Sequence, residues 1–146
     1  MIRRLRQKLI AGQKSSLWQY IHNRKVELKD YVIYGYSNIP PTPFLLKDWE
    51  RYDVSRYADP GCIHPTEGRR TVVEEADIEY STIYDDLQVL AGNDSMKKSI
   101  FLFHSPPYKT KLDRADLDGQ FIDHVPLDVR VGSIAIQRFI EERQPL

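Results

Sequence analysis

The pentapeptide Ser99–Phe103 (SIFLF) constrains the fold more than any other stretch, because nearly all of it is large and apolar. Successive residues of a strand point to opposite faces, so a strand with this sequence has no polar face to turn toward water. The pattern is typical of a strand covered on both sides, by helices or by a second sheet. His104 follows it directly, ahead of Ser105-Pro106-Pro107-Tyr108.

Helical patterns lie on either side of this strand. An apolar stripe predicts one helix of about three turns from roughly Asp77 to Leu90, with Gly92 as its stop. A second stripe predicts a last helix that begins near Gly132 and Ser133, where the Ser133 hydroxyl can cap the first turn. Helix, buried strand, loop and helix together indicate an α/β fold.

The chain before these elements predicts a helix and a hairpin. Residues 2–22 have a helical pattern, with a break expected near Gly12. Val26–Leu28 and Tyr31–Tyr36 have the alternation and the aromatic and β-branched content of strands, and Asp30 between them fits a tight turn.

Residues 37–70 predict a long excursion with little regular structure. Three prolines at its start fix φ and remove amide donors, which favours an ordered loop over a helix or strand. A loop of this length in a compact domain is usually functional, or it packs on something else.

The charge balance divides the chain. Residues 1–26 contain seven basic residues and no acid, whereas the whole chain has 21 of each, so the remainder is acidic. A basic start is compatible with nucleic-acid binding, with a transit peptide or with a solvated helix face. We expect the solvated face, because a basic segment alone is weak evidence for a nucleic-acid partner.

Composition indicates one domain in a reducing compartment. A hydrophobic content of 41% and a charged content of 29% are those of a globular protein. The single Cys62 cannot form an internal disulfide, which favours a cytoplasmic location, and no apolar run is long enough for a membrane helix.

His104 and Asn93 both resemble metal ligands, but the strand between them keeps them apart. Five strand residues span about 17 Å. Paired metal ions lie about 3.5–4 Å apart, so residues at opposite ends of one strand cannot both serve them. In α/β folds, functional groups gather at the carboxyl ends of strands, where His104 is expected. Asn93 is interpreted as part of the helix stop.

Other polar residues have weaker patterns. Asp113, Asp116 and Asp118 lack the glycine and glutamate of a calcium loop, so we expect a solvated acidic loop. His22 and His64 have no companions in the sequence and are expected at the surface.

Three stretches resemble the calcineurin-like metallophosphoesterases. They are IFLFHSPPYKTKLD, then DHVPLDVRVGSIAIQRFIEERQPL, and upstream YVIYGYSNIPPTPFLLKDWERYD. The specific elements are His-x-Pro after an apolar strand, Gly-Ser opening a helix, and Gln-Pro after it. The resemblance covers about Val26 to Leu146, and we therefore divide the chain into a basic helical segment, 1–25, and an incomplete metallophosphoesterase-like domain, 26–146.

The resemblance implies a four-layer α-β-β-α sandwich with two divalent metal ions, such as Mn, Fe, Zn or Ni, that act on a phosphoester. It implies that His104 is a ligand of one metal. It makes Ser105, Tyr108 and His124 candidates for an active-site loop, although a surface position is the more ordinary expectation for His124.

The family's other ligand motifs are missing from this sequence. No Asp-x-His or Gly-Asp-x-x-Asp precedes residue 30, and no Gly-His-x-His occurs after Gln144. We therefore expect a segment of a two-metal phosphatase or phosphodiesterase that is inactive as this chain alone. The alternative is a non-catalytic subunit, which associates with another copy or with a missing half-domain through an exposed half-sheet.

Overall fold

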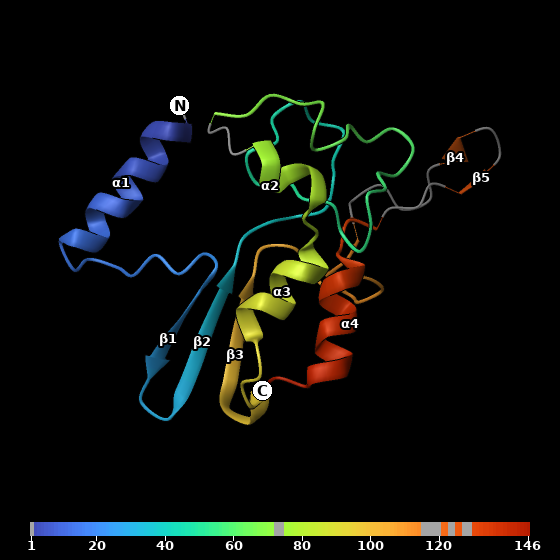
Figure 1. The fold of residues 1–146 in the computed structure, drawn as a ribbon. Coiled ribbons are helices and arrows are strands. Elements are labelled where there is room, and N and C mark those ends of the chain that lie inside the picture. Colours follow the sequence, from blue (N-terminus) through green and yellow to red (C-terminus); the bar gives the residue numbers. More distant parts are fainter. Residues whose placement is uncertain (1, 72–74, 115–120, 123–124, 127–129) are drawn as a thin grey trace.

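The computed structural model describes residues 2–71, 75–114, 121–122, 125–126 and 130–146. It confirms a mixed α/β fold, with a three-stranded sheet and helices packed against one face of it (Figure 1). The long helices are α1 (Ile2–Lys14), α3 (Ile83–Ala91) and α4 (Ile134–Arg143). Two short helical segments, α2 (Glu75–Tyr80) and the 3-10 turn Met96–Lys98, precede α3 and β3, respectively.

The sheet has the order β1-β2-β3. As predicted, β1 (Arg24–Leu28) and β2 (Tyr31–Tyr36) form an antiparallel hairpin, in which Leu28 pairs with Tyr31. The turn between them places Lys29 at a φ of 55°. β3 (Ser99–Phe103) lies parallel to β2, so the two central strands end at the same edge of the sheet.

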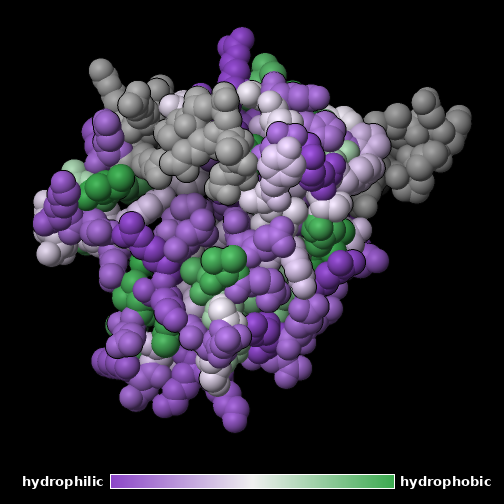
Figure 2. Space-filling model, viewed as in Figure 1, coloured by the Kyte–Doolittle hydropathy of each residue, from purple (hydrophilic) through white to green (hydrophobic). Residues whose placement is uncertain are grey.

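The core lies between this sheet and the two helices α3 and α4, which lie side by side (Figure 1). Tyr34 stacks on Phe101 with ring centroids 4.5 Å apart, and Phe139 of α4 meets Phe101 edge-on at 4.9 Å. Such aromatic pairs contribute about 0.5–1.5 kcal/mol beyond the area that they bury. The face of the molecule seen in Figure 2 is mainly hydrophilic, with isolated hydrophobic residues among polar ones.

The opposite face of the sheet is only partly covered, which corrects the expectation that β3 is buried on both sides. The pairing places Val26, Ile33 and Ile100 on this face, and Leu28, Tyr31 and Leu102 lie on it as well. Leu102 is 55% exposed and Leu28 is 58% exposed, so they are not covered as core residues are. The apolar pattern of β3 thus reflects a second apolar face rather than a second layer present among the described residues. We call these six residues the open face.

The predicted helix over residues 2–22 is shorter than expected, and its break is not at Gly12. α1 ends at Lys14, and Ser16 then takes a φ of 56°, which a helix cannot accommodate. Gly12 lies inside the helix, where a Cβ atom would come within 2.0 Å of the Trp18 ring. The glycine therefore lets the chain fold back, and Trp18 donates from its indole nitrogen to the carbonyl oxygen of Leu9 at 2.8 Å.

The single helix predicted from Asp77 to Leu90 is divided in two. α2 ends at Tyr80, and Thr82, in an extended conformation, caps α3 by accepting from the Asp85 amide at 3.0 Å. The Ile83 amide donates to Tyr52 at 2.7 Å, so a contact with the long loop fixes the break. The spacing of apolar residues along the helix does not reveal a contact with so distant a residue.

The prediction of an ordered loop over residues 37–70 is confirmed. A buried ion pair organises it, in which the Lys47 ammonium contacts Glu50 at 2.5 Å and donates to the Thr42 carbonyl at 2.7 Å. Lys47 is fully buried, and Glu50 also accepts from the Thr42 amide and hydroxyl. A buried charge is tolerated only when it is paired in this way.

The remaining segments differ in detail from the prediction. The stretch 104–131, expected to be loop, includes two paired two-residue strands, β4 (Phe121–Ile122) and β5 (Val125–Pro126). The last helix begins as predicted, with the Ser133 hydroxyl accepting from the Ile136 amide at 3.0 Å. None of the helices in the described part of the chain is both long and apolar enough to cross a bilayer.

Candidate functional site

The candidate site lies where β2 and β3 end. Tyr36 and Phe103 are paired at the last position of the two strands, so Ser37 and His104 follow side by side at one edge. The His104 amide donates to the Tyr36 carbonyl at 3.2 Å, which extends the ladder by one bond. This is the edge at which open α/β sheets usually bind ligands.

The imidazole of His104 is oriented by the backbone of Ser37. Its Nδ1 lies 3.3 Å from the Ser37 carbonyl oxygen, and the residue is exposed. Because a carbonyl can only accept, this contact requires the proton on Nδ1 and leaves the lone pair on Nε2. Metal-ligating histidines are usually held in this way, with one ring nitrogen donating to a carbonyl or carboxylate and the other facing the metal.

His22 also contacts Ser37, but here the ring nitrogen is the acceptor and the backbone amide is the donor. The Ser37 amide donates to Nδ1 of His22 at 3.1 Å, so in the neutral ring the proton is on Nε2. The ring also meets Trp49 edge-on, with centroids 5.5 Å apart. In this tautomer Nε2 of His22 carries a proton, so the ring cannot bind a metal ion through that nitrogen. The expectation of a lone surface residue was nevertheless wrong, because His22 packs against the end of β2.

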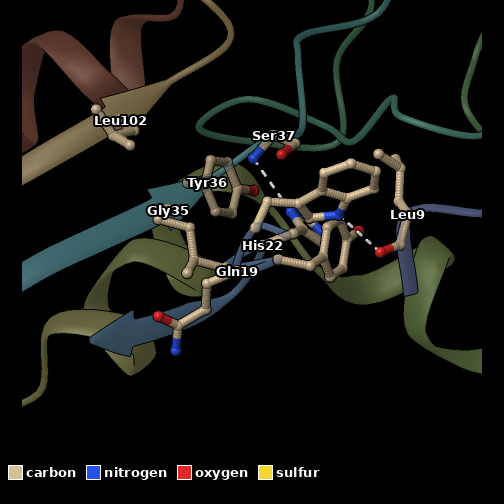
Figure 3. Close-up of a pocket in the computed structure, with 10 residues that line it drawn as sticks. Leu9, Gln19, His22, Gly35, Tyr36, Ser37 and Leu102 are labelled. Atoms are coloured by element: carbon tan, nitrogen blue, oxygen red, sulfur yellow. Dashed lines mark hydrogen bonds between the residues drawn. The ribbon is translucent and has the colours of Figure 1, made fainter. Parts of the chain in front are cut away.

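A groove of about 350 Å³ opens beside His22 and Ser37 (Figure 3). The segment after α1 forms one side of it, and the ends of β2 and β3 form the other. Gly35 makes the close approach possible, since a Cβ atom there would lie 2.5 Å from the side chain of Ile21. The groove is lined by Leu9, Trp18, Gln19, Tyr20, Ile21, His22, Gly35, Tyr36, Ser37 and Leu102.

A buried polar network supports the end of β2 from the helix side. The carboxylate of Asp86 accepts from the Tyr36 hydroxyl at 2.7 Å and from Asn38 at 3.4 Å, and it pairs with Arg51 at 3.0 Å. Burial, followed by the charge of Asp86, raises the pKa of Tyr36 well above its ordinary value. Tyr36 thus stays protonated and acts as a fixed donor to Asp86 rather than as a base.

Ser105 and Tyr108, the candidates for an active-site loop, both follow His104 and contact the backbone or neighbouring side chains. Ser105 is buried, with its hydroxyl 3.4 Å from the Pro106 carbonyl oxygen. The Tyr108 amide donates to Ser133 at 3.0 Å, and its ring has Lys109 and Arg130 at 5.5 and 5.6 Å. The loop is therefore anchored to the start of α4, whereas His104 is anchored to Ser37.

Asp113 corrects the expectation of a solvated acidic loop. Its carboxylate is fully buried and accepts from the amides of Lys109 and Val131, each at 2.7 Å, and from that of Gly132. It thereby joins the loop after His104 to the residues before α4. Asp116 and Asp118, the rest of that acidic run, lie outside the described residues, as does His124.

A second carboxylate fixes the start of α4. Asp53, which lies in the long loop, accepts from the Ser133 hydroxyl at 2.5 Å and from the amides of Ile134 and Ala135 at 2.7 and 3.3 Å. Burial raises the pKa of Asp53, while these three donors oppose that rise. A negative charge at a helix N-terminus is favourable, so this contact ties the loop to the helix that follows the candidate site.

The remaining candidates take structural positions. Gly92 ends α3 with a φ of 51°, and its amide donates to Gln88, which confirms the helix stop beside Asn93. His64 contacts the Tyr52 hydroxyl at 3.1 Å and is not an isolated surface residue. Among the residues that the structure describes, no three histidine, cysteine, aspartate or glutamate side chains are grouped so that they could hold a metal ion.

Comparisons with known proteins give no relative on which to draw. No family model matches the chain, and the searches of curated proteins and of solved structures found no match.

Proposed function

We propose that residues 26–146 are a segment of a two-metal phosphoester hydrolase, with His104 as a ligand of one divalent metal ion. The observation that supports this most is the contact between Nδ1 of His104 and the Ser37 carbonyl. It holds the ring at the carboxyl edge of two parallel strands with the Nε2 lone pair available.

The open face gives independent support. A four-layer α-β-β-α sandwich needs a sheet with helices on one face and an apolar surface on the other, against which the second sheet packs. α3 and α4 cover one face of this sheet, and the six apolar residues of the open face lie on the other.

Among the described residues, no three histidine, cysteine, aspartate or glutamate side chains are grouped to hold a metal ion, so His104 would be one ligand of a set that these residues do not complete. A single imidazole cannot hold a catalytic pair of metal ions against water. When bound, the metal ions would activate water and neutralise phosphate charge. In this proposal His104 would bind one metal ion through Nε2, and the Ser37 carbonyl would hold the imidazole ring in that orientation.

Two experiments test this proposal. The 146-residue chain, supplied with Mn²⁺ and p-nitrophenyl phosphate, should release no substantial p-nitrophenol. A Mn²⁺-stimulated release that disappears in His104→Ala would show that the chain is active alone.

The gene should also encode Asp-x-His before residue 1 and Gly-His-x-His after residue 146. The protein with both motifs should be a Mn²⁺-dependent phosphoesterase, and a gene without them would contradict the proposal.

The exposure of the open face favours a second candidate, a subunit that associates without catalysis. Leu28, Tyr31 and Leu102 are all more than 40% exposed on this face. Light scattering should then show a dimer or larger species, and Leu102→Asp should shift it toward monomer. Glu142→Ala, on the exposed side of α4, is the matched control. A monomer at high concentration would exclude this candidate.

A further inference from the structure

We propose that α1 and the turn that follows it bind the surface of an anionic lipid bilayer, with the helix lying in the plane of the headgroups. This inference goes beyond the proposed function, because it concerns residues 2–18 and does not involve His104. A helix can lie on a bilayer without crossing it when basic residues flank an apolar side that carries large residues such as tryptophan. α1 and its turn combine these features.

The basic residues of the chain are concentrated at its start. Residues 1–26 hold seven of the 21 basic residues and none of the 21 acidic ones, so the remainder has seven more acidic residues than basic ones. Lys8 and Lys14 of α1 are exposed. An anionic surface therefore attracts this end of the chain and repels the rest, which orients the molecule with α1 toward the lipid.

α1 also has an apolar side, which Trp18 extends. Leu9 and Gly12 lie three residues apart and so share one side of the helix, and the sequence has Ile2 and Leu5 at the same spacing. Trp18 folds back onto this side. A Cβ atom at Gly12 would lie 2.0 Å from its ring, and its indole nitrogen donates to the Leu9 carbonyl at 2.8 Å. The apolar side therefore continues from the helix into the turn.

Large apolar side chains remain exposed in this part of the chain. Leu17 is 71% exposed, Trp18 is 46% exposed and Ile10 is 41% exposed. Figure 1 shows α1 beside the body of the molecule, away from α3 and α4. Exposed apolar residues that are grouped together and bordered by basic ones mark an interaction surface.

The exposed apolar residues favour a bilayer over a nucleic acid. Tryptophan rings concentrate at the membrane–water interface. The N–H of Trp18 is already bonded to Leu9, so the ring can enter the acyl boundary without leaving a donor unsatisfied. A nucleic acid would use the basic residues, and its bases can stack on Trp18, but it offers no apolar surface for Leu17.

Sedimentation with lipid vesicles tests the inference on the whole chain. The protein should bind vesicles of phosphatidylcholine with about 30% phosphatidylserine, and it should bind pure phosphatidylcholine vesicles far less. Raising NaCl from about 0.1 M to about 0.5 M should release it, because salt screens the attraction. Lys8→Gln combined with Lys14→Gln should weaken binding about 30-fold. The matched control is Lys97→Gln combined with Lys98→Gln, two exposed lysines before β3, which should leave binding unchanged.

The apolar contribution has its own test. Leu17→Ser should weaken vesicle binding about 10-fold. Its urea midpoint should stay unchanged, because the side chain is already 71% exposed. Val89→Ser is the matched control, since Val89 is 84% exposed on α3 and should not contribute to binding. Anionic vesicles should also shift the tryptophan emission to shorter wavelength, and Trp18→Phe should abolish the shift.

Several outcomes would overturn the inference. They are the absence of sedimentation with anionic vesicles, equal sedimentation with neutral ones, and equal losses in the test and control variants. Salt-sensitive binding to a DNA or RNA oligonucleotide without any vesicle binding would also overturn it, and would assign α1 to a nucleic acid instead. None of these results bears on His104, so this inference and the proposed function can fail separately.

Discussion

Replacing Asp113 with alanine should destabilise the chain more than any other single change in the loop after His104. The buried carboxylate accepts from three backbone amides, those of Lys109, Val131 and Gly132. Each amide left without an acceptor costs about 1–3 kcal/mol. Because these amides are only partly buried and can gain some water, the lower end applies to each, and the expected loss is about 3 kcal/mol.

Urea denaturation followed by circular dichroism measures this loss as a lower midpoint at unchanged slope. A chain of this size should also melt about 6–12 °C lower. Asp113→Asn retains one acceptor oxygen and should lose less, and Glu142→Ala, at an exposed position of α4, should stay within about 0.5 kcal/mol. A loss below about 1 kcal/mol for Asp113→Ala would refute the role assigned to the carboxylate.

Two further substitutions test other contacts, one beside Asp113 and one between Asp94 and Lys25. Gly132→Ala should cost about 1–3 kcal/mol in a urea titration, because its Cβ atom would lie 2.7 Å from both the Asp113 carboxylate and the Pro106 carbonyl; an unchanged midpoint would contradict that close approach. Asp94 pairs with Lys25, and this bond, with a second from Tyr34, holds the pKa of the carboxyl below its ordinary value of 3.8. Its contribution to stability is therefore present above pH 3.8 and is lost as the pH falls through the lowered folded pKa. Asp94→Asn should then lower the urea midpoint more at pH 7 than at pH 2, and an equal loss at both pH values would argue against the ion pair.

The elements that sequence predicts well are those whose pattern and contacts are local. The hairpin of Val26–Leu28 and Tyr31–Tyr36, the strand Ser99–Phe103, and the cap of the last helix at Ser133 are confirmed. Each depends on alternation, a tight turn or a capping side chain within a few residues.

The elements that were mispredicted depend on contacts between distant segments. The break before α3 is fixed by Tyr52, which lies 31 residues before Ile83. α1 ends where Trp18 folds back across Gly12, and a helical pattern over the same residues does not reveal this turn. Tertiary contacts override local propensity at both places.

The candidate site was predicted in part. The position of His104 after an apolar strand predicts that it lies at the carboxyl edge of the sheet, and the structure places it there, because β2 and β3 are parallel and end together. His22 was missed, since nothing in the sequence links it to Ser37, which it meets across the end of β2. The burial of Asp113 was missed for the same reason, as Val131 and Gly132 lie 18 and 19 residues away.

The contact with the Ser37 carbonyl should hold His104 in the tautomer of a metal ligand. Long-range proton–nitrogen NMR spectra of the histidine rings measure this directly, because they distinguish the protonated from the unprotonated nitrogen. At pH 8, His104 should carry its proton on Nδ1 and His22 should carry its proton on Nε2. Substoichiometric Mn²⁺ should then broaden the His104 signals before those of the other three histidines. A proton on Nε2 of His104, or equal broadening of all four rings, would contradict the claim.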